Sequence, residues 1–310
     1  MAKEVELTTN FDDILHDAEI KIVVELMGGL HPAKGYISDA LNAGKNVVTA
    51  NKDLMATFGS ELIALAAKNK CDLMYDASVA GGIPILRTLS TSYASDNISE
   101  IQGIINGTTN YILSQMGEKG LSYDEALKNA PKLGFVEADP TNDVTGKDAA
   151  YNIAGKLFVK VAPCLLPNNA IMSHIKDEIN ALQIKSQSLG TAIFTGPGAG
   201  SLATANSVMS DVIAETSNFV KKTNGQPFSN FSRTMKLTSS EEVKYPYYLS
   251  FETEETLLDL SELFSKLEIP VREIKHVDEK TIVVTEEISR RQLQDLAIQD
   301  KYLRASYKIL

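Results

Sequence analysis

The sequence contains few of the residues on which metal centres and disulfide frameworks depend. Only two cysteines, Cys71 and Cys164, occur in 310 residues, and they lie far apart with no Cys-x-x-Cys pair. The four histidines are scattered and lack the spacing of metal ligands. This scarcity argues against a disulfide-stabilised fold and against a transition-metal site, and it indicates a protein of the reducing cytoplasm.

Positive charge and long apolar segments are also scarce. Lysine and arginine number 30 against 40 aspartates and glutamates, which gives a net charge of -10. We therefore expect neither nucleic acids nor anionic membranes as partners. No apolar run approaches the roughly 20 residues of a membrane-spanning helix, and residues 1–15 lack the basic and apolar parts of a secretory signal. The three Asn-x-Ser/Thr sequences, at Asn97, Asn106 and Asn230, are accordingly expected to be chance matches.

The opening of the chain lacks the glycine fingerprint of dinucleotide-binding folds. Such a fold begins with a strand that leads into Gly-x-Gly-x-x-Gly, with an acidic residue about 20 positions further on, and nothing before Ile20 supplies it. After Ile20, short apolar runs alternate with amphipathic helical patterns that begin near Pro32 and Leu54. The expected strands are 20–26, 45–50 and 71–77. This order predicts a parallel, right-handed α/β sheet in a Rossmann-like nucleotide-binding domain that is incomplete at its N-terminus.

The middle of the chain lacks the regular strand–helix alternation of the first part. The expected elements are a strand at 99–105, helices at 109–116 and 123–133, and an acidic loop at 134–143. Further on, the glycine-rich segment 196–201 precedes another predicted helix. The apolar residues expected on one face of this helix are Leu202, Ala205, Val208, Met209, Val212 and Ile213. Residues 223–243 are polar and indicate a linker.

The last stretch has a pattern of its own. Its strands are expected at 247–252, 271–276, 281–285 and at the closing Ser306–Leu310, with helices around Leu260 and at 289–297. The resulting order βαββαβ predicts a ferredoxin-like module, a fold that by itself implies no function.

Several groups of residues could carry chemistry. Glu137, Asp139, Asp143 and Asp148 could hold a substrate ammonium and hydroxyl by charge-assisted hydrogen bonds, or they could form a solvated loop with helix caps. Lys52 follows a strand at the edge where open α/β sheets bind ligands, although a surface lysine would also explain it. The glycines in 76–84 and 196–200 permit close backbone approach or anion binding at a helix N-terminus, or form ordinary turns.

Taken together and in order, six stretches of the chain resemble homoserine dehydrogenase. They are VVELMGG at 23–29, TANK at 49–52, ASVAGGIP at 77–84, GIINGTTNYIL at 103–113, GFVEADPTNDVTGKDAA at 134–150 and GPGAG at 196–200. The resemblance implies NAD(P)-dependent interconversion of L-homoserine and L-aspartate 4-semialdehyde, a step toward threonine, methionine and isoleucine. It also implies a homodimer or a higher homo-oligomer.

The resemblance also assigns roles to residues. Lys52 matches a catalytic lysine beside nicotinamide and substrate, Glu137 and Asp148 match substrate-binding carboxylates, and Asp143 matches an acidic residue of the same pocket, with Asp148 counted as catalytic too. Residues expected to contact the NAD or NADP cofactor are Met27, Gly28, Lys52, Gly198 and Gly200. The main-chain carbonyls expected to bind a structural sodium ion are those of Asp76, Val79, Gly81 and Ile83. A hard cation held by backbone oxygens is chemically reasonable.

The chain departs from the family pattern at two places. Where the family has a second lysine four residues after the position of Asp148, this chain has Asn152, whose amide cannot transfer a proton as an ammonium can. A helical segment that follows in the family is missing after Tyr151, and so is the first βαβ unit. We therefore expect the numbered chain to omit stretches of a longer parent, in which case Asn152 is not the counterpart of that lysine.

Three domains are expected. The nucleotide-binding domain comprises 1–80 and 196–222, a substrate-binding and dimerisation domain of α+β type occupies 81–195, and a βαββαβ module that resembles an ACT domain occupies 244–310. That module would bind threonine as an effector or serve only as a packing contact. Two rival functions remain at this point: a catalytically impaired relative that binds amino acids for regulation, and another dehydrogenase of a small amino-acid aldehyde.

Overall fold

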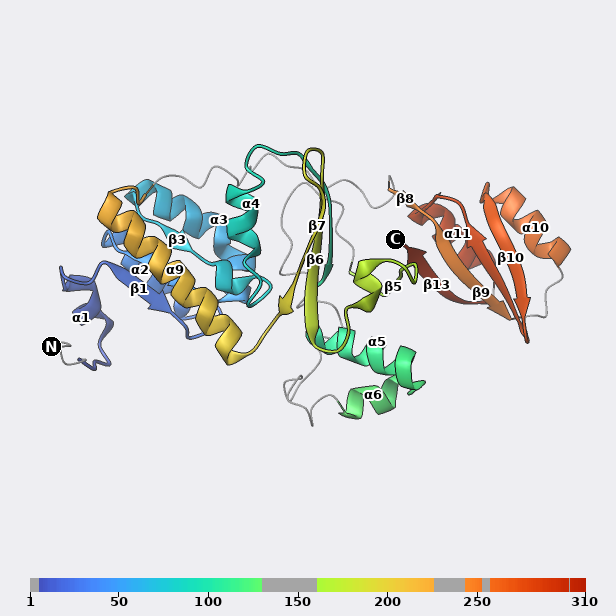
Figure 1. The fold of residues 1–310 in the computed structure, drawn as a ribbon, viewed down its shortest axis with the longest axis horizontal. Helices are drawn as coiled ribbons and strands as arrows, with labels where there is room; N and C mark the ends of the chain where they lie inside the picture. The colour runs from blue at the N-terminus through green and yellow to red at the C-terminus, as the bar shows by residue number, and fades with distance from the viewer. Residues whose placement is uncertain (1–5, 130–160, 226–242, 253–256, 301) are drawn as a thin grey trace. The chain divides into compact units, whose positions relative to one another are not determined.

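A computed structural model describes residues 6–129, 161–225, 243–252, 257–300 and 302–310, with the backbone alone at 257–259. The chain divides into two compact units (Figure 1). The first combines residues 1–154 with 175–233, and the second combines 155–174 with 234–310.

The first unit contains the expected parallel sheet. Its strands are β1 (Ile22–Glu25), β2 (Asn46–Thr49) and β3 (Leu73–Met74), hydrogen-bonded in the order β1-β2-β3. Val24 lies beside Val48, and Val48 beside Met74. Successive side chains of a strand point to opposite faces, so Val47 packs into one hydrophobic cluster and Val48 into another.

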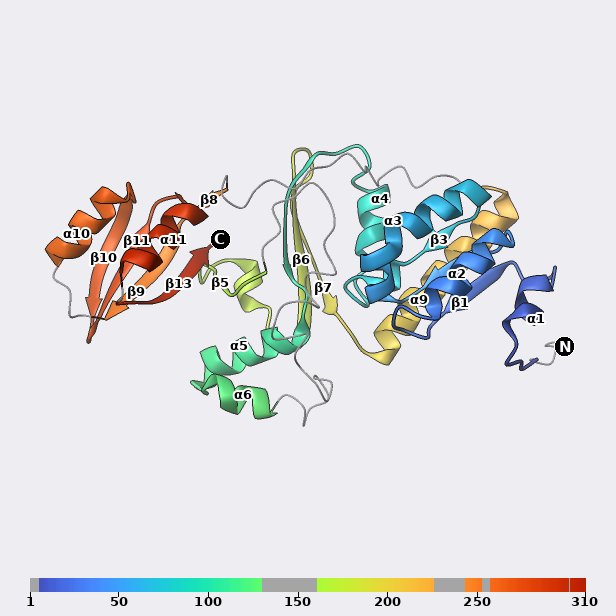
Figure 2. The same ribbon diagram turned by 180° about the vertical axis from the view of Figure 1, so that it is seen from behind.

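Two helices cover the Val47 face of this sheet (Figure 2). They are α2 (Ala33–Asn42) and α3 (Lys52–Asn69), preceded by the short α1 (Phe11–His16). Ile37 and Leu41, four residues apart on α2, are fully buried against the sheet. Gly44 ends α2 in a left-handed conformation with φ of +74°, which glycine adopts without strain. The helices and the parallel strands confirm the predicted α/β pattern.

The opposite face of the sheet is covered by α9 (Ser201–Lys221), which follows far later in the sequence (Figure 1). Val208 and Val212 of α9 pack against Val48 and Ala77. The predicted apolar face of α9 is only partly right, because Leu202, Met209 and Ile213 are exposed at 86%, 54% and 66%. The fully buried positions include Ser207, Asp211 and Glu215, which are four residues apart and therefore share one face of the helix.

The predicted third strand is shorter than expected. The strand pairing ends at Met74, and Asp76–Ser78 form the 3-10 helix η1. Its turn is closed by bonds from the backbone N–H groups of Ser78 and Val79 to the carbonyls of Tyr75 and Asp76. Local hydrogen bonds thus replace the sheet ladder at this edge. Helix α4 (Ile85–Thr91) follows.

A second, antiparallel sheet in the same unit has the order β4-β6-β7. Its strands are β4 (Ile98–Ile104), β6 (Ile179–Ser186) and β7 (Gly190–Pro197). Ile105, Leu182 and Ile184 pack in one buried cluster with Ile83 and Ile85. This cluster joins the sheet to the segment that follows β3.

Helices α5 (Gly107–Lys119) and α6 (Tyr123–Asn129) complete the described part of this unit. Asn106 caps α5, because its side-chain oxygen accepts from the backbone N–H of Thr109 at 2.8 Å. The side-chain amide of Asn110 lies within 3.0–3.3 Å of the carbonyl oxygens of Ile175, Asp177 and Ile179. The first turn of α5 is thereby fixed to the segment that leads into β6.

The second unit has the predicted ferredoxin-like order. Its main elements are β9 (Tyr247–Glu252), α10 (Leu257–Lys266), β10 (Val271–Val277), β11 (Lys280–Thr285), α11 (Arg290–Gln299) and β13 (Leu303–Ile309). The strands pair antiparallel in the order β10-β11-β9-β13, and the short β5 (Cys164–Leu165) extends the sheet beside β13. Shorter elements of this unit are η3 (Ile171–His174), β8 (Lys244–Tyr245) and β12 (Ile288–Ser289). Leu249, Phe251 and Phe264 are among the residues of a buried core.

Candidate active site

The carboxyl ends of β1 and β2 are joined by a buried carboxylate. Glu25, the last residue of β1, accepts a hydrogen bond from the Thr49 hydroxyl at 2.6 Å. Its other oxygen accepts from the backbone N–H of Met27 at 2.7 Å and from that of Gly28 at 3.3 Å. Glu25 therefore sets the direction in which the chain leaves the sheet, and it had not been predicted as a site residue.

Asn51 makes a second link between the same two strand ends. Its side-chain amide donates to the carbonyl of Gly29 at 2.7 Å, and its side-chain oxygen accepts from the backbone N–H of Leu54 at 3.1 Å. Asn51 is thus the N-cap of α3, and Lys52 is the first residue of that helix. Lys52 lies directly after the carboxyl end of β2, as predicted, at the sheet edge where ligands of parallel α/β folds bind.

The backbone at Gly28 and Gly29 is open. Both residues have positive φ, at +73° and +70°, and a Cβ added to either would meet no atom within 4 Å. Met27, beside them, is 54% exposed. An uncrowded glycine backbone at the carboxyl edge of a parallel sheet suits the close approach of a dinucleotide, so the residues present fit a nicotinamide cofactor.

The segment 76–84 follows β3 at the same edge and is held in a tight loop. The carboxylate of Asp76 accepts from the backbone N–H of Leu86 at 3.0 Å, which ties the two ends of the loop together. Ala80 and Gly81 have φ of +54° and +56°. A left-handed conformation is strained for alanine and persists only where the surroundings enforce it.

The carbonyls predicted to bind sodium lie in this loop. Those of Asp76, Gly81 and Ile83 each accept one hydrogen bond, from Val79 N–H, the Ser207 hydroxyl and Ile85 N–H respectively. A carbonyl oxygen has two lone pairs, so each retains one for a cation. Sodium binding by these main-chain oxygens stays a prediction.

Two glycine-rich motifs meet at Gly81. A Cβ on Gly81 would lie 2.2 Å from the carbonyl oxygen of Gly198, and the backbone N–H of Gly82 donates to the carbonyl of Pro197 at 3.0 Å. Gly200, with φ of +110°, then begins the 21-residue helix α9. The loops 76–84 and 196–200 are therefore packed against each other, with the predicted residue Gly198 in contact with Gly81.

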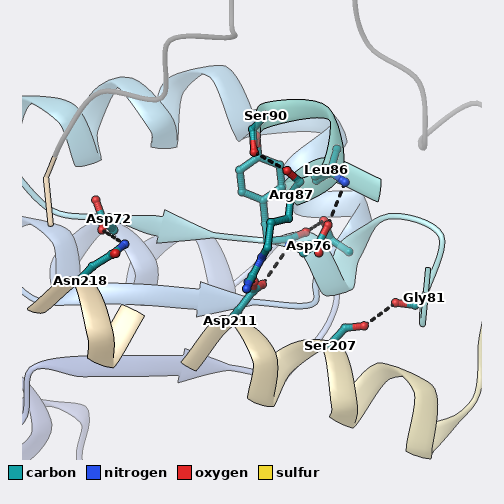
Figure 3. Close-up of polar contacts among 11 residues, drawn as sticks. Asp72, Asp76, Gly81, Leu86, Arg87, Ser90, Ser207, Asp211 and Asn218 are labelled. Carbon is teal, nitrogen blue, oxygen red and sulfur yellow. Dashed lines mark hydrogen bonds and ion pairs between the residues drawn. The ribbon is translucent and has the colours of Figure 1, made fainter. Parts of the chain in front are cut away.

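An ion pair joins the partly exposed Arg87 to the buried Asp211 next to this loop (Figure 3). The Arg87 guanidinium contacts one oxygen of Asp211 at 2.6 Å, and the other oxygen accepts from the backbone N–H of Asp76 at 3.0 Å. Burial raises the pKa of both Asp76 and Asp211, and the neighbouring Asp211 charge adds to the rise at Asp76. The Arg87 charge and the backbone N–H donors oppose that rise.

Asn180 of β6 lies directly beneath the second glycine loop. Its side chain is packed against Gly198 so closely that a Cβ there would fall 1.7 Å from the amide nitrogen. Asn180 is 2% exposed, and its side-chain oxygen has no hydrogen-bond partner within the described parts of the chain. Gly198 is therefore needed for contact with β6.

The predicted carboxylates of the substrate pocket fall outside the described residues. Glu137, Asp139, Asp143, Asp148 and Asn152 all lie in 130–160. Their roles remain predictions. The other predicted positions lie in one unit and at one sheet edge. They are the residues after β1, those after β2, and those in 76–84 and 196–200.

Five residues that organise this edge were missed from the sequence. They are Glu25, Asn51, Arg87, Ser207 and Asp211. Asn51 could have been found, because an asparagine before an amphipathic helix is a common N-cap. The other four depend on partners far away in the sequence, as in the Asp76–Asp211 bond across 135 positions, and no local pattern reveals them.

Two kinds of feature are missing from the residues that the structure places. Within 6–129 and the later described ranges, no three or more histidine, cysteine or acidic side chains gather as a metal site would require. In the same ranges, no helix combines the length and the apolar character needed to cross a bilayer.

Comparison with known proteins gives a consistent result. The family profile described as "Homoserine dehydrogenase, NAD binding domain" matches residues 1–76, and that described as "Homoserine dehydrogenase" matches 84–154 and 151–213. A homoserine dehydrogenase of Lactococcus lactis is 36% identical, over 96% of this chain and 82% of the relative. One of Bacillus subtilis is 40% identical, over 77% and 67%. The crystal structure of a homoserine dehydrogenase from Thiobacillus denitrificans aligns with a TM-score of 0.88 and 27% identity, over 98% of this chain and 85% of that one.

Proposed function

The chain belongs to the homoserine dehydrogenase family, and on that basis we propose that its active site lies at the carboxyl edge of the β1-β2-β3 sheet. It is an NAD(P)-dependent oxidoreductase of amino-acid biosynthesis that interconverts L-homoserine and L-aspartate 4-semialdehyde. The observation that supports the proposed location is the pair of bonds Thr49–Glu25 and Asn51–Gly29, which join the ends of β1 and β2 directly before Lys52.

In this site Lys52 contacts the reacting oxygen of the substrate, and its ammonium stabilises negative charge that develops there. Glu137, Asp143 and Asp148 bind the amino group and the hydroxyl, and this orients the reacting carbon. Met27, Gly28, Gly198 and Gly200 contact the NAD or NADP cofactor, which supplies or accepts the hydride when bound. The carbonyls of Asp76, Val79, Gly81 and Ile83 hold a sodium ion that stiffens the 76–84 loop.

The test of this site is the variant Lys52→Ala. Its turnover is measured as the decrease in reduced-nicotinamide absorbance when aspartate 4-semialdehyde is the substrate. We expect turnover to fall at least about a hundredfold, the scale of losing one aimed electrostatic donor. Lys68→Ala is the matched control, because Lys68 is an exposed lysine in the last turn of the same helix. Turnover in Lys52→Ala equal to that in Lys68→Ala would place the reaction elsewhere.

Three domains follow from the same proposal: 1–80 with 196–222 for the nucleotide, 81–195 for substrate binding and dimerisation, and 244–310 as an ACT-like module. The packing of α9 on the first sheet supports the first of these. We propose a homodimer or higher oligomer in the cytoplasm, and sedimentation of the purified chain measures the oligomeric state.

The ACT-like module is proposed to bind threonine. Its sheet carries an open hollow of about 530 Å³, lined by Tyr248, Val277, Asp278, Glu279, Lys280 and Ile282. Charges of both signs beside apolar walls suit a zwitterionic amino acid with a small side chain. Calorimetric titration with threonine should give binding that Lys280→Ala weakens while Lys266→Ala does not. Equal binding by the two variants would place the threonine site outside this hollow, and no binding by the parent protein would leave the module with a packing role.

A further inference from the structure

Helix α9 holds the 76–84 loop at two points. The Ser207 hydroxyl donates to the carbonyl of Gly81 at 2.8 Å, and the Asp211 carboxylate accepts from the backbone N–H of Asp76 at 3.0 Å (Figure 3). Ser207 and Asp211 are four residues apart, so they present their polar groups on one face of the helix. Both are buried, at 6% and 1% exposure.

These two contacts bracket the strained part of the loop. Between Asp76 and Gly81 lies Ala80, with its left-handed φ of +54°, and Gly81 itself abuts the backbone of Gly198. A left-handed alanine is strained and persists only where the neighbouring backbone is held. The bonds from Ser207 and Asp211 hold that backbone from the side of α9.

The chemistry at position 211 specifically suits a carboxylate. One oxygen faces the Arg87 guanidinium and the other faces a backbone N–H, so both must accept. An asparagine at this position would point its amide N–H donor at one of these two donors, and the hydrogen bond there would be lost. Arg87 is in turn fixed to the start of α4, so the pair joins α9, α4 and the loop.

We infer that Ser207 and Asp211 are positioning residues of the dehydrogenase, which act through the 76–84 loop to align substrate and cofactor. The inference rests on the proposed site at this sheet edge. Neither residue is proposed to touch a reactant. Ser207 holds the loop backbone at Gly81 and Asp211 holds it at Asp76. A misplacement of about 1 Å at a reacting centre costs up to a hundredfold in rate.

Ser207→Ala is the variant to test, because it removes one hydrogen bond and leaves the ion pair intact. Thr216→Ala is its control, since the Thr216 hydroxyl bonds only the carbonyl of Val212 in the same helix and is exposed. Asp211→Asn is the second variant. Its kinetic result counts only if its circular dichroism spectrum matches that of the parent. If the spectra differ, the result for Ser207→Ala alone decides the inference.

The first readout is hydrogen exchange of the protein without cofactor. In Ser207→Ala, amides of peptides covering 76–86 should exchange about fivefold faster, the factor for one lost hydrogen bond, while those of α3 keep the parent rate. Exchange at 76–86 equal to that in Thr216→Ala would overturn the inference.

The second readout is the chemical step. Ser207→Ala should lower kcat by about tenfold and enlarge the primary isotope effect measured with deuterated reduced cofactor, because hydride transfer becomes rate-limiting. A mere loss of folded protein lowers kcat without changing the isotope effect. Faster exchange with kcat and isotope effect at parent values would also overturn the inference.

Failure of this inference can be told from failure of the proposed site. If Lys52→Ala loses turnover and Ser207→Ala keeps parent kcat and isotope effect, the site stands and the positioning role falls. If Lys52→Ala keeps turnover, the proposed site falls and takes the positioning role with it, whatever the exchange rates show.

Discussion

Glu215 of α9 buries its carboxyl group against the carboxylate of Asp72, the residue that precedes β3. Glu215 is completely buried, and neither of its oxygens meets a donor among the described residues. Asp72 is already held by the backbone N–H of Gly225 at 2.7 Å and by the side-chain amide of Asn218 at 3.3 Å. A hydrogen bond between the two carboxyl groups therefore requires a proton on one of them, and the Glu215 carboxyl is the one without other partners.

This arrangement predicts that stability falls as the pH rises from mildly acidic to mildly alkaline. Burial, followed by the bond to Asp72 and its charge, raises the pKa of Glu215 from 4.5 to about 8. A raised pKa in the folded state means that the stabilisation is complete below pH 4.5 and declines as pH rises toward 8, by up to about 1.4 kcal/mol per pH unit. Glu215→Gln, which stays neutral, should therefore be more stable than the parent at pH 9. Urea unfolding at pH 6 and pH 9 measures this, and a constant difference between the two proteins would refute it.

Gly81→Ala should destabilise the protein through a backbone collision. The added Cβ would approach the Gly198 carbonyl to 2.2 Å, whereas the same change at Gly44, also at positive φ, meets nothing within 4 Å. Gly44→Ala should cost only the left-handed strain of about 1–2 kcal/mol, and Gly81→Ala about 1–3 kcal/mol more. Urea midpoints with unchanged slopes give both values. Equal losses at the two positions would mean that the loops can separate without cost.

Asn110→Asp should be more damaging than its small change in size suggests. The amide donors that now face the carbonyls of Ile175, Asp177 and Ile179 would be replaced by a carboxylate, which repels those oxygens. We expect a loss of about 2–4 kcal/mol in the free energy of unfolding. Asn42→Asp is the control, because exposed Asn42 uses its side-chain oxygen as an acceptor and keeps it. A similar shift in melting temperature for both variants would contradict the role given to Asn110.

Phe251→Ala should weaken the ferredoxin-like module selectively. Phe251 is fully buried and meets Phe264 edge-on, with ring centroids 6.0 Å apart. Removing it should cost about 3–5 kcal/mol, while Tyr307→Ala on the partly exposed side of the same sheet should cost about 1 kcal/mol or less. Hydrogen exchange of β9 and β11 reports the change locally. Protection of those strands that is no lower in Phe251→Ala than in Tyr307→Ala would refute it.

The regular elements were predictable because their patterns are local. The short apolar run of β2, the four-residue spacing of Ile37 and Leu41, and the βαββαβ order all follow from neighbours in the sequence. The orientation of α9 was not predictable in the same way. The apolar pattern predicts that Met209 and Ile213 are buried, but both are exposed. The buried face of α9 instead carries Ser207, Asp211 and Glu215. Their partners on the first sheet and its loop are Gly81, Asp76 and Asp72 respectively.

The candidate site was predictable in outline only. Position after a strand and glycine content pointed to Lys52, Gly28 and the loops at 76–84 and 196–200. The contact of Gly81 with Gly198 and the supporting role of Glu25 depend on distances between segments, which no local pattern contains. The roles of Glu137, Asp143 and Asp148 stay predictions, since they lie outside the described residues.

The return of α9 to the first sheet has a consequence for how the protein is made. Asp76 and Asp211 are separated by 135 positions, and ribosomes add about 5–20 residues per second. For roughly 7–27 s during translation, the Val48 face of β2 has emerged while the helix that covers it has not been synthesised. The nascent chain therefore carries an uncovered apolar sheet face over that interval, which is the kind of surface that chaperones bind.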